Sequence, residues 1–155
     1  MAAGAWQFYG LSLEKMFENT VGPLDDSGTP RFRMALVTSS YTPSVNVDDT
    51  WSDISTNEVA NGGGYTTHGK LLACTLSHSS GTITFDCDDQ SWTSSTITAK
   101  YAVIVQDADA NGALAAGDFI VCYCDLETGG GSVSTTNGTF AVTIHANGLF
   151  QLAQA

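Results

Sequence analysis

Apolar and polar residues alternate along much of the chain from Arg31 onward, with the period of two that a half-buried β-strand requires. The first such segment begins at Arg31 and places large apolar residues at every second position, at Phe32, Met34 and Leu36. Six further segments are predicted strands, several of them rich in β-branched and aromatic residues: Leu71–Leu76, Thr82–Cys87, Thr96–Gln106, Phe119–Asp125, Thr139–His145 and Leu149–Leu152. Turn-rich segments separate them, such as Asn111–Gly112, Asn137–Gly138 and Asn147–Gly148.

A different spacing marks the residues ahead of the first strand. Residues 11 to 19 are predicted to form a short helix, because apolar side chains recur on one helical face at Leu13, Met16 and Phe17. Ser12 is the expected N-cap, and Gly22 and Pro23 are expected to end the helix. Before the helix lies an aromatic segment that is expected either to pack on the domain or to lie on a neighbouring molecule, Trp6, Phe8 and Tyr9.

Short strands with regular turn signals, and one helix outside them, predict an all-β fold. An antiparallel β-sandwich or barrel with jelly-roll-like topology is the preferred form. In this prediction residues 1–30 form the aromatic arm and the short N-terminal helix, and residues 31–155 form the sandwich, within one globular domain. Residues 46 to 64 lack a strand pattern and are expected to be a loop with one helical turn at Trp51 to Ile54.

The number and sign of the charged residues limit the kinds of partner that the protein can bind. Charged residues make up 14% of the chain, against about 25% in a typical soluble domain, so Ser, Thr, Asn and Gly must cover the surface. The net charge is −11, with five Lys and Arg residues, which predicts that the protein does not bind nucleic acid. The sequence shows neither a signal-peptide pattern nor an apolar stretch of membrane-spanning length. We therefore expect a soluble protein, made in the cytosol, that binds no membrane.

The four cysteines contain no C-x-x-C pair, so a zinc site is not favoured. Cys122 and Cys124 lie two residues apart in an apolar run, and on an extended strand both would point to one face as small buried side chains. All four cysteines, Cys74 and Cys87 included, are expected to be free thiols in the core.

The segment from Asp107 to Asp118 matches the spacing of a calcium-binding loop, D-x-[DN]-x-[DN]-G followed by an acidic residue at position twelve. The oxygen ligands would come from Asp107, Asp109, Asn111 and Asp118. However, Asp118 is shorter than the usual Glu, and both flanks are predicted strands rather than helices. A β-hairpin that turns at Asn111–Gly112 is therefore the preferred interpretation, and a hairpin that also holds a structural Ca²⁺ is the alternative. No cofactor is required.

The sequence holds no G-x-S-x-G, H-E-x-x-H or catalytic-cysteine signature, and its histidines, His68, His78 and His145, lie in or beside turns. We expect that the protein is not an enzyme. Three aromatic residues beside turn-rich segments, Trp51, Tyr65 and Trp92, support an alternative in which exposed rings stack on sugars. The competing interpretation is that these rings cap the ends of the sandwich.

The order of several segments resembles small β-rich proteins encoded among the structural genes of tailed phages. The matching stretches are Met34–Pro43, Trp51–Ile54, Glu58–Val59, Gly64–Tyr65 with Gly69–Lys70, Ser91–Ile104 and Asn137–Val142. The resemblance implies a virion component without catalytic residues, most specifically a capsid decoration or cement protein that binds the outside of the head. The matching stretches are strands and turns, so they identify the scaffold better than the role. A neck, tail or fibre component could use the same scaffold.

By the same resemblance, the expected partners are the major capsid protein and further copies of the chain, with a homotrimer favoured. The protein would then be located on the virion, after assembly in the host cytoplasm. The attachment surface is expected on the aromatic arm and the helix face, at Trp6, Phe8, Tyr9, Met16 and Phe17. A carbohydrate-binding or host-adhesion module is the alternative function, through Trp51, Tyr65 and Trp92.

Overall fold

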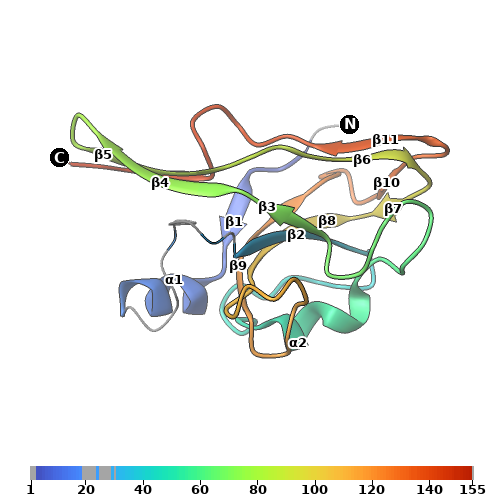
Figure 1. The fold of residues 1–155 in the computed structure, drawn as a ribbon, viewed down its shortest axis with the longest axis horizontal. Coiled ribbons are helices and arrows are strands. Elements are labelled where there is room, and N and C mark those ends of the chain that lie inside the picture. The colour runs from blue at the N-terminus through green and yellow to red at the C-terminus, as the bar shows by residue number, and fades with distance from the viewer. Residues whose placement is uncertain (1–2, 19–23, 25–28, 30, 155) are drawn as a thin grey trace.

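A five-stranded antiparallel sheet forms the centre of the molecule (Figure 1). The computed structural model describes residues 3–18, 24, 29 and 31–154, and most of its regular structure is β-strand. The strand order in the central sheet is β1-β9-β8-β2-β3. These strands span Trp6–Phe8 (β1), Phe119–Asp125 (β9), Tyr101–Gln106 (β8), Phe32–Val37 (β2) and Lys70–Leu72 (β3). The predicted all-β, antiparallel class is therefore confirmed.

A second layer of strands lies over one face of the central sheet (Figure 1). It contains a three-stranded sheet in the order β12-β5-β4 and a two-stranded sheet of β11 and β6. Another strand pair, β10 and β7, completes the regular structure. The bounds are Cys74–Ser79 (β4), Thr82–Cys87 (β5), Gln90–Ser95 (β6), Thr98–Ala99 (β7), Val133–Ser134 (β10), Gly138–Val142 (β11) and Phe150–Ala153 (β12).

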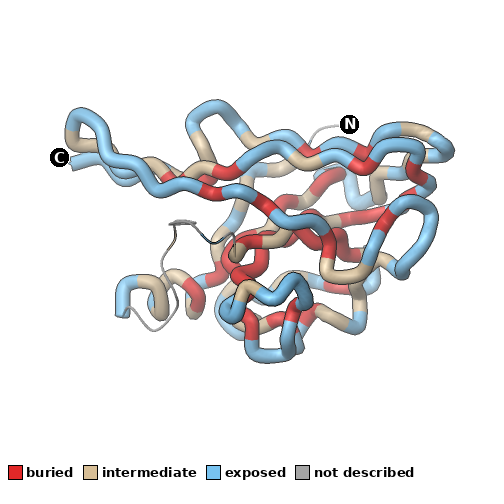
Figure 2. The backbone as a smooth tube through the Cα atoms, in the orientation of Figure 1, coloured by how far each residue is buried: buried red, intermediate tan, exposed pale blue. Residues whose placement is uncertain are grey.

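The central sheet is covered on both faces. On one face, Phe32, Met34 and Leu36 pack in a core with residues of the second layer such as Phe85 and Trp92. On the other face, a second cluster joins the alternate strand residues Ala35, Val37, Val103 and Val105 to Trp51 and Ile54. The expectation that β2 is half-buried is therefore wrong, because helix α2 (Trp51–Ile54) and its neighbouring loops cover the face assigned to solvent. Figure 2 shows this buried interior.

Helix α1 spans Gly10–Phe17, and Tyr9 precedes it as an N-cap without a side-chain hydrogen bond. Ser12 lies inside the first turn and is buried, and its hydroxyl donates to the carbonyl of Ile120 at 2.5 Å. The prediction of Ser12 as N-cap is wrong, because this serine anchors the helix to β9 instead. The predicted helix end at Gly22 and Pro23 lies outside the described residues.

Helix α2 forms where a helical turn was predicted. It begins with a capping box, in which Thr50 and Asp53 exchange side-chain and backbone hydrogen bonds. A short 3₁₀ helix, η1 (Ser55–Asn57), follows directly. None of the helices that the structure describes has the length and apolar character needed to span a bilayer.

The aromatic segment ahead of α1 is a strand of the central sheet. In β1, Trp6 is paired with Cys124 and Phe8 with Cys122 on β9. Tyr9 is fully buried. Of the two arrangements that were left open for this segment, packing on the domain is the one observed.

Two of the four cysteines form a disulfide. Cys74 and Cys87 are directly opposed on β4 and β5 and are bonded to each other, so the expectation of four free thiols is wrong for this pair. Strand register places the two residues together, and spacing in the sequence does not report it. Cys122 and Cys124 are free and buried, as predicted.

The predicted strand from Thr96 to Gln106 is divided into β7 and β8 at Lys100. The buried Lys100 ammonium forms an ion pair with Asp125 at 2.8 Å and donates to the carbonyl of Glu127. A buried charge must be paired to be tolerated. The break in the strand therefore carries the interactions that keep this lysine inside.

Candidate functional site

Exposed apolar side chains gather beside α1. The described chain has six exposed large apolar residues, and four of them, Phe17, Leu76, Ile83 and Leu152, line one recess. Phe17 is the most exposed, at 78%. Contiguous exposed apolar surface on a soluble protein commonly marks a site of interaction. This recess, hereafter the groove, is therefore the candidate functional site.

One wall of the groove is the outer end of the three-stranded sheet of β4, β5 and β12, hereafter the ribbon. Its apolar face continues from the core, since the buried Phe85 lies opposite Leu76 on β4 and Phe150 on β12. One step further out, Ile83 is paired with Leu152. Side chains two residues apart on a strand share a face, so the face that buries Phe85 extends into solvent. The ribbon projects past the body of the molecule, and its outer end is exposed (Figures 1 and 2).

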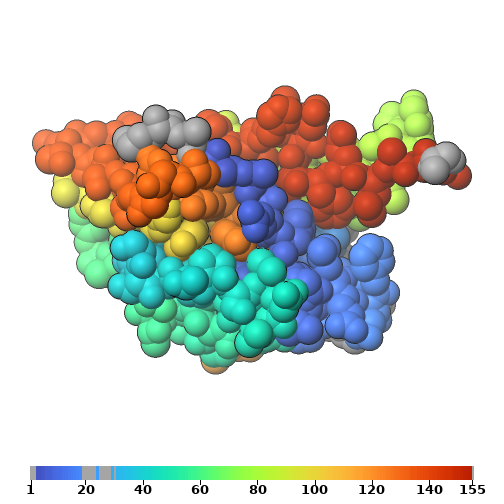
Figure 3. All heavy atoms as spheres, turned by 180° about the vertical axis from the view of Figure 1, so that it is seen from behind, coloured from blue at the N-terminus to red at the C-terminus, as the bar shows by residue number. Residues whose placement is uncertain are grey.

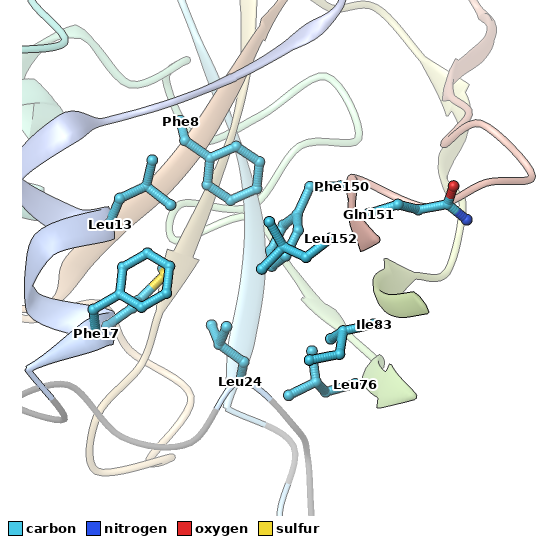
Figure 4. Close-up of a pocket in the computed structure, with 10 residues that line it drawn as sticks. Phe8, Leu13, Phe17, Leu24, Leu76, Ile83, Phe150, Gln151 and Leu152 are labelled. Atoms are coloured by element: carbon cyan, nitrogen blue, oxygen red, sulfur yellow. The ribbon is translucent and has the colours of Figure 1, made fainter. Parts of the chain in front are cut away.

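The opposite wall comes from β1 and α1, with Phe8, Leu13, Met16 and Phe17. Figure 4 shows Phe8, Leu13 and Phe17 facing the side chains of the ribbon across the groove, and Figure 3 shows the ribbon extending above α1. The groove has a volume of about 380 Å³, and Gln151 is its only polar lining residue among the described part of the chain. Such a volume falls in the range of small-ligand and side-chain pockets, roughly 300–1,000 Å³.

The inner end of the groove is fixed by aromatic packing. Phe8 of β1 meets Phe150 of β12 edge to face, with ring centroids 5.2 Å apart. Phe150 in turn packs on the buried Phe85, with centroids 5.7 Å apart. These contacts join the two walls to the core, so the groove is part of the folded framework.

The sequence predicted one wall of this site and missed the other. Phe8, Met16 and Phe17 were expected attachment residues and meet in the groove. Trp6 does not line it, and Tyr9 is buried beneath the central sheet. Leu76, Ile83 and Leu152 lie in segments that were predicted as strands. Whether their side chains are buried could not be judged without knowing that the ribbon projects beyond the body.

The segment from Asp107 to Asp118 forms the predicted hairpin, since Gln106 of β8 is paired with Phe119 of β9. Both carboxylates are buried and accept backbone N–H groups of the loop. Asp107 accepts from Gly112 at 2.9 Å and from Asn111 at 3.3 Å. Asp118 accepts from Ala115 at 2.7 Å and from Ala108 at 3.1 Å.

The carboxylates of this hairpin are hydrogen-bonded within the loop. Each of the four carboxylate oxygens of Asp107 and Asp118 accepts one backbone N–H group, so the loop is held together by its own hydrogen bonds. Asp109 is exposed and accepts from the side-chain amide of Asn111 at 2.7 Å. Within the described residues, no group of three or more His, Cys, Asp or Glu side chains is arranged to hold a metal.

The three rings expected to stack on sugars are buried. Trp51 packs in the cluster beneath the central sheet, and Tyr65 and Trp92 belong to the main core. The Tyr65 hydroxyl donates to Glu58 at 2.8 Å and accepts from the backbone N–H of Leu36 at 3.0 Å. The hypothesis that these rings are exposed is therefore wrong, because neighbouring turns say nothing of where a side chain packs.

A polar cluster holds the loop after α2 against β2. Glu58 accepts from the backbone N–H of His68 at 2.5 Å as well as from Tyr65. Arg33 donates to the carbonyls of His68 and Gly69, and His68 accepts from the backbone N–H of Leu114. Burial raises the pKa of Glu58, although these hydrogen bonds oppose the change. The cluster was not predicted, and its interactions link loops rather than assemble a nucleophile and a base.

The comparisons with known proteins add no relative. No protein-family model matches the chain, and no curated protein or solved structure matches it.

Proposed function

We propose that this protein is a structural component of a tailed-phage virion, and most specifically a decoration or cement protein on the outside of the head. The observation that carries the proposal is the exposed apolar groove, built on rigid strands and joined to the core. Such a surface suits docking onto another protein. The segment order resembles that of phage structural proteins, and this resemblance implies that the docking partner is another protein of the virion.

In this proposal the groove contacts the major capsid protein, and several copies bridge adjacent shell subunits. A homotrimer is the favoured form, because simultaneous attachment at several points gives avidity without strong individual contacts. The two layers of strands are proposed to be a β-sandwich with jelly-roll-like topology. Attachment by a free aromatic arm is not part of the proposal, since β1 is a strand of the central sheet.

A neck, tail or fibre component would use the same docking surface and is the second form of this proposal. The carbohydrate-binding alternative loses its support, because Trp51, Tyr65 and Trp92 are buried.

The test is the composition of purified particles of the phage whose genome encodes this chain. Quantitative mass spectrometry is expected to find the protein at a fixed ratio to the major capsid protein, and antibody labelling is expected to mark the head. A particle without the protein refutes the virion role, and labelling confined to the tail refutes the decoration role.

A further inference from the structure

We infer that the groove binds an apolar segment of a partner protein that is flanked by Lys or Arg residues. This inference rests on the proposed function, in which the partner is a shell subunit, and it adds the chemistry by which that partner is recognised. Three features carry it: the shape of the groove, the exposed acidic side chains of α1, and the net negative charge of the chain.

The groove suits a short inserted segment. Its walls are apolar, and its volume of about 380 Å³ is that of a small pocket. A stable flat interface usually buries about 800 Å² from about 20–30 residues on each partner, whereas ten described residues line the groove. One or two large apolar side chains on a peptide segment would fill the space and cover the exposed ring of Phe17.

The wall formed by α1 is acidic on its outer side. Glu14 and Glu18 follow the groove residues Leu13 and Phe17 directly in the sequence, and both are exposed. A segment that enters the groove along α1 therefore gains from positive charge at its ends.

A second copy of this chain is a poor source of that charge. Lys15 and Lys100 form ion pairs with Asp49 and Asp125. Arg33 donates to two backbone carbonyls and Lys70 to another, and Arg31 also interacts within the structure. Each copy has a net charge of −11, so two copies meeting at α1 would repel each other.

The ribbon gives the bound segment a direction. Residues 71–85 and 128–155, which include β4, most of β5 and all of β12, contain no Asp, Glu, Lys or Arg. The exposed acidic residues Glu14 and Glu18 belong to α1, which forms the opposite wall. The apolar part of the segment is therefore expected to lie against the ribbon, with its basic flank over α1.

The experiment measures fluorescence anisotropy with three labelled peptides, KKSLFSLKK, EESLFSLEE and KKSSSSSKK. We expect the first peptide to bind at least about tenfold more tightly than the other two, because loss of apolar burial or of charge attraction each weakens binding by about this factor. Raising the salt concentration from 50 to 300 mM is expected to weaken its binding.

Two matched variants locate the site. Leu152 is 48% exposed in the groove, and Leu71 is 49% exposed outside it, so Leu152→Asp and Leu71→Asp make the same change at equal exposure. Leu152→Asp is expected to reduce affinity for KKSLFSLKK by about tenfold or more, whereas Leu71→Asp leaves it unchanged. A double Glu14→Gln and Glu18→Gln variant is expected to bind the basic peptide more weakly and to lose most of the salt dependence. Circular dichroism melts confirm that each variant folds.

Several results overturn the inference. Equal affinity for the basic-flanked and acidic-flanked peptides would show that charge plays no part in recognition. An equal loss of affinity in Leu152→Asp and Leu71→Asp would show that the groove is not the binding site. A concentration-dependent dimer in sedimentation that Leu152→Asp abolishes assigns the groove to a second copy. Binding of a neutral alkyl detergent at the groove, with no binding of any peptide, assigns it to an acyl chain.

The two proposals fail in distinguishable ways. If the protein binds KKSLFSLKK through the groove but is missing from purified particles, the virion role fails and the peptide specificity stands. If particles contain the protein and retain Leu152→Asp at full occupancy, the virion role stands and the groove is not the attachment site.

Discussion

The Tyr9 hydroxyl donates to the Tyr41 oxygen at 2.8 Å, beneath the central sheet, and Tyr41 donates in turn to Asp48 at 2.7 Å. The direction of the first bond follows from the second, since the single hydroxyl proton of Tyr41 is used on Asp48. This chain of bonds ties the residue before α1 to the loop before α2. Burial raises the pKa of both hydroxyls, so both stay protonated and able to donate.

Because of the direction of these bonds, removing the hydroxyl of Tyr41 is expected to cost more stability than removing that of Tyr9. Tyr41→Phe leaves the fully buried Tyr9 hydroxyl without an acceptor and is expected to lower the free energy of unfolding by about 1–3 kcal/mol. Tyr9→Phe leaves the Tyr41–Asp48 bond intact and is expected to cost about 0.5–1.5 kcal/mol. Urea denaturation of both variants checks the order. The double variant is expected to cost less than the sum of the two, and strict additivity would contradict the shared bond.

Glu58 is expected to make the stability of the folded protein depend on pH. Burial raises its pKa above the ordinary value of 4.5 in the folded protein. Its protonated form therefore favours folding below pH 4.5, and this contribution is lost as pH rises through the raised pKa. Glu58→Gln cannot titrate, so the stability of the variant relative to the original protein should increase over that window.

Thermal melts from pH 3.5 to 7.5 measure this difference. Glu18→Gln on α1 serves as the control, because it makes the same change in net charge at an exposed position. A difference between Glu58→Gln and the original protein that stays constant with pH would show that Glu58 has no raised pKa.

The Asp107 to Asp118 hairpin is expected to be stable without calcium. Its carboxylates are already satisfied by backbone N–H groups, so the melting temperature should be the same in excess Ca²⁺ and in EGTA. Asp118→Ala removes the acceptor of two part-buried backbone N–H bonds and is expected to lower stability by about 1–3 kcal/mol in both solutions. A melting temperature raised by Ca²⁺, and not by Mg²⁺, would restore the ion to this loop.

The cysteines should react in a fixed order. Burial raises the pKa of Cys124 to about 11 and that of Cys122 well above its usual range, so neither is a reactive thiolate at pH 8. A colorimetric disulfide reagent should therefore detect no thiol in the folded protein, two after denaturation and four after denaturation with reduction. Two thiols detected in the folded state would place Cys122 and Cys124 at the surface.

The disulfide is expected to stabilise the ribbon specifically. Replacing both Cys74 and Cys87 by Ala opens a loop with a sequence separation of 13 residues, for which the expected loss is about 3 kcal/mol. Hydrogen exchange should show the loss in β4 and β5 first, ahead of the central sheet. Uniform loss of protection across all strands would mean that the ribbon does not open separately.

Local signals in the sequence predicted local structure well. Alternation located β2, β5 and β9, and the Asn111–Gly112 pair located the hairpin between β8 and β9. The helical turn at Trp51 was also predicted, because capping by Thr50 and Asp53 depends on residues close in the chain.

What could not be predicted depends on contacts between distant segments. Serine is a residue type that favours N-caps, yet the hydrogen-bond acceptor of Ser12 is the carbonyl of Ile120, which lies 108 residues away. The pairing of Cys74 with Cys87 depends on strand register. The groove has the same origin, since Phe17 and Leu152 come from opposite ends of the chain and meet only in the folded molecule.

The position of β1 at the edge of the central sheet, paired with β9, has a consequence for synthesis. Cys124, the partner of Trp6, is made 118 residues after it. Until then the aromatic side chains of the first strand have no sheet to join, and chain closure over such a separation is slow. β1 is made before the other strands of the central sheet but is expected to be among the last to be placed, and a chain stalled before β9 would expose Trp6, Phe8 and Tyr9 to chaperones.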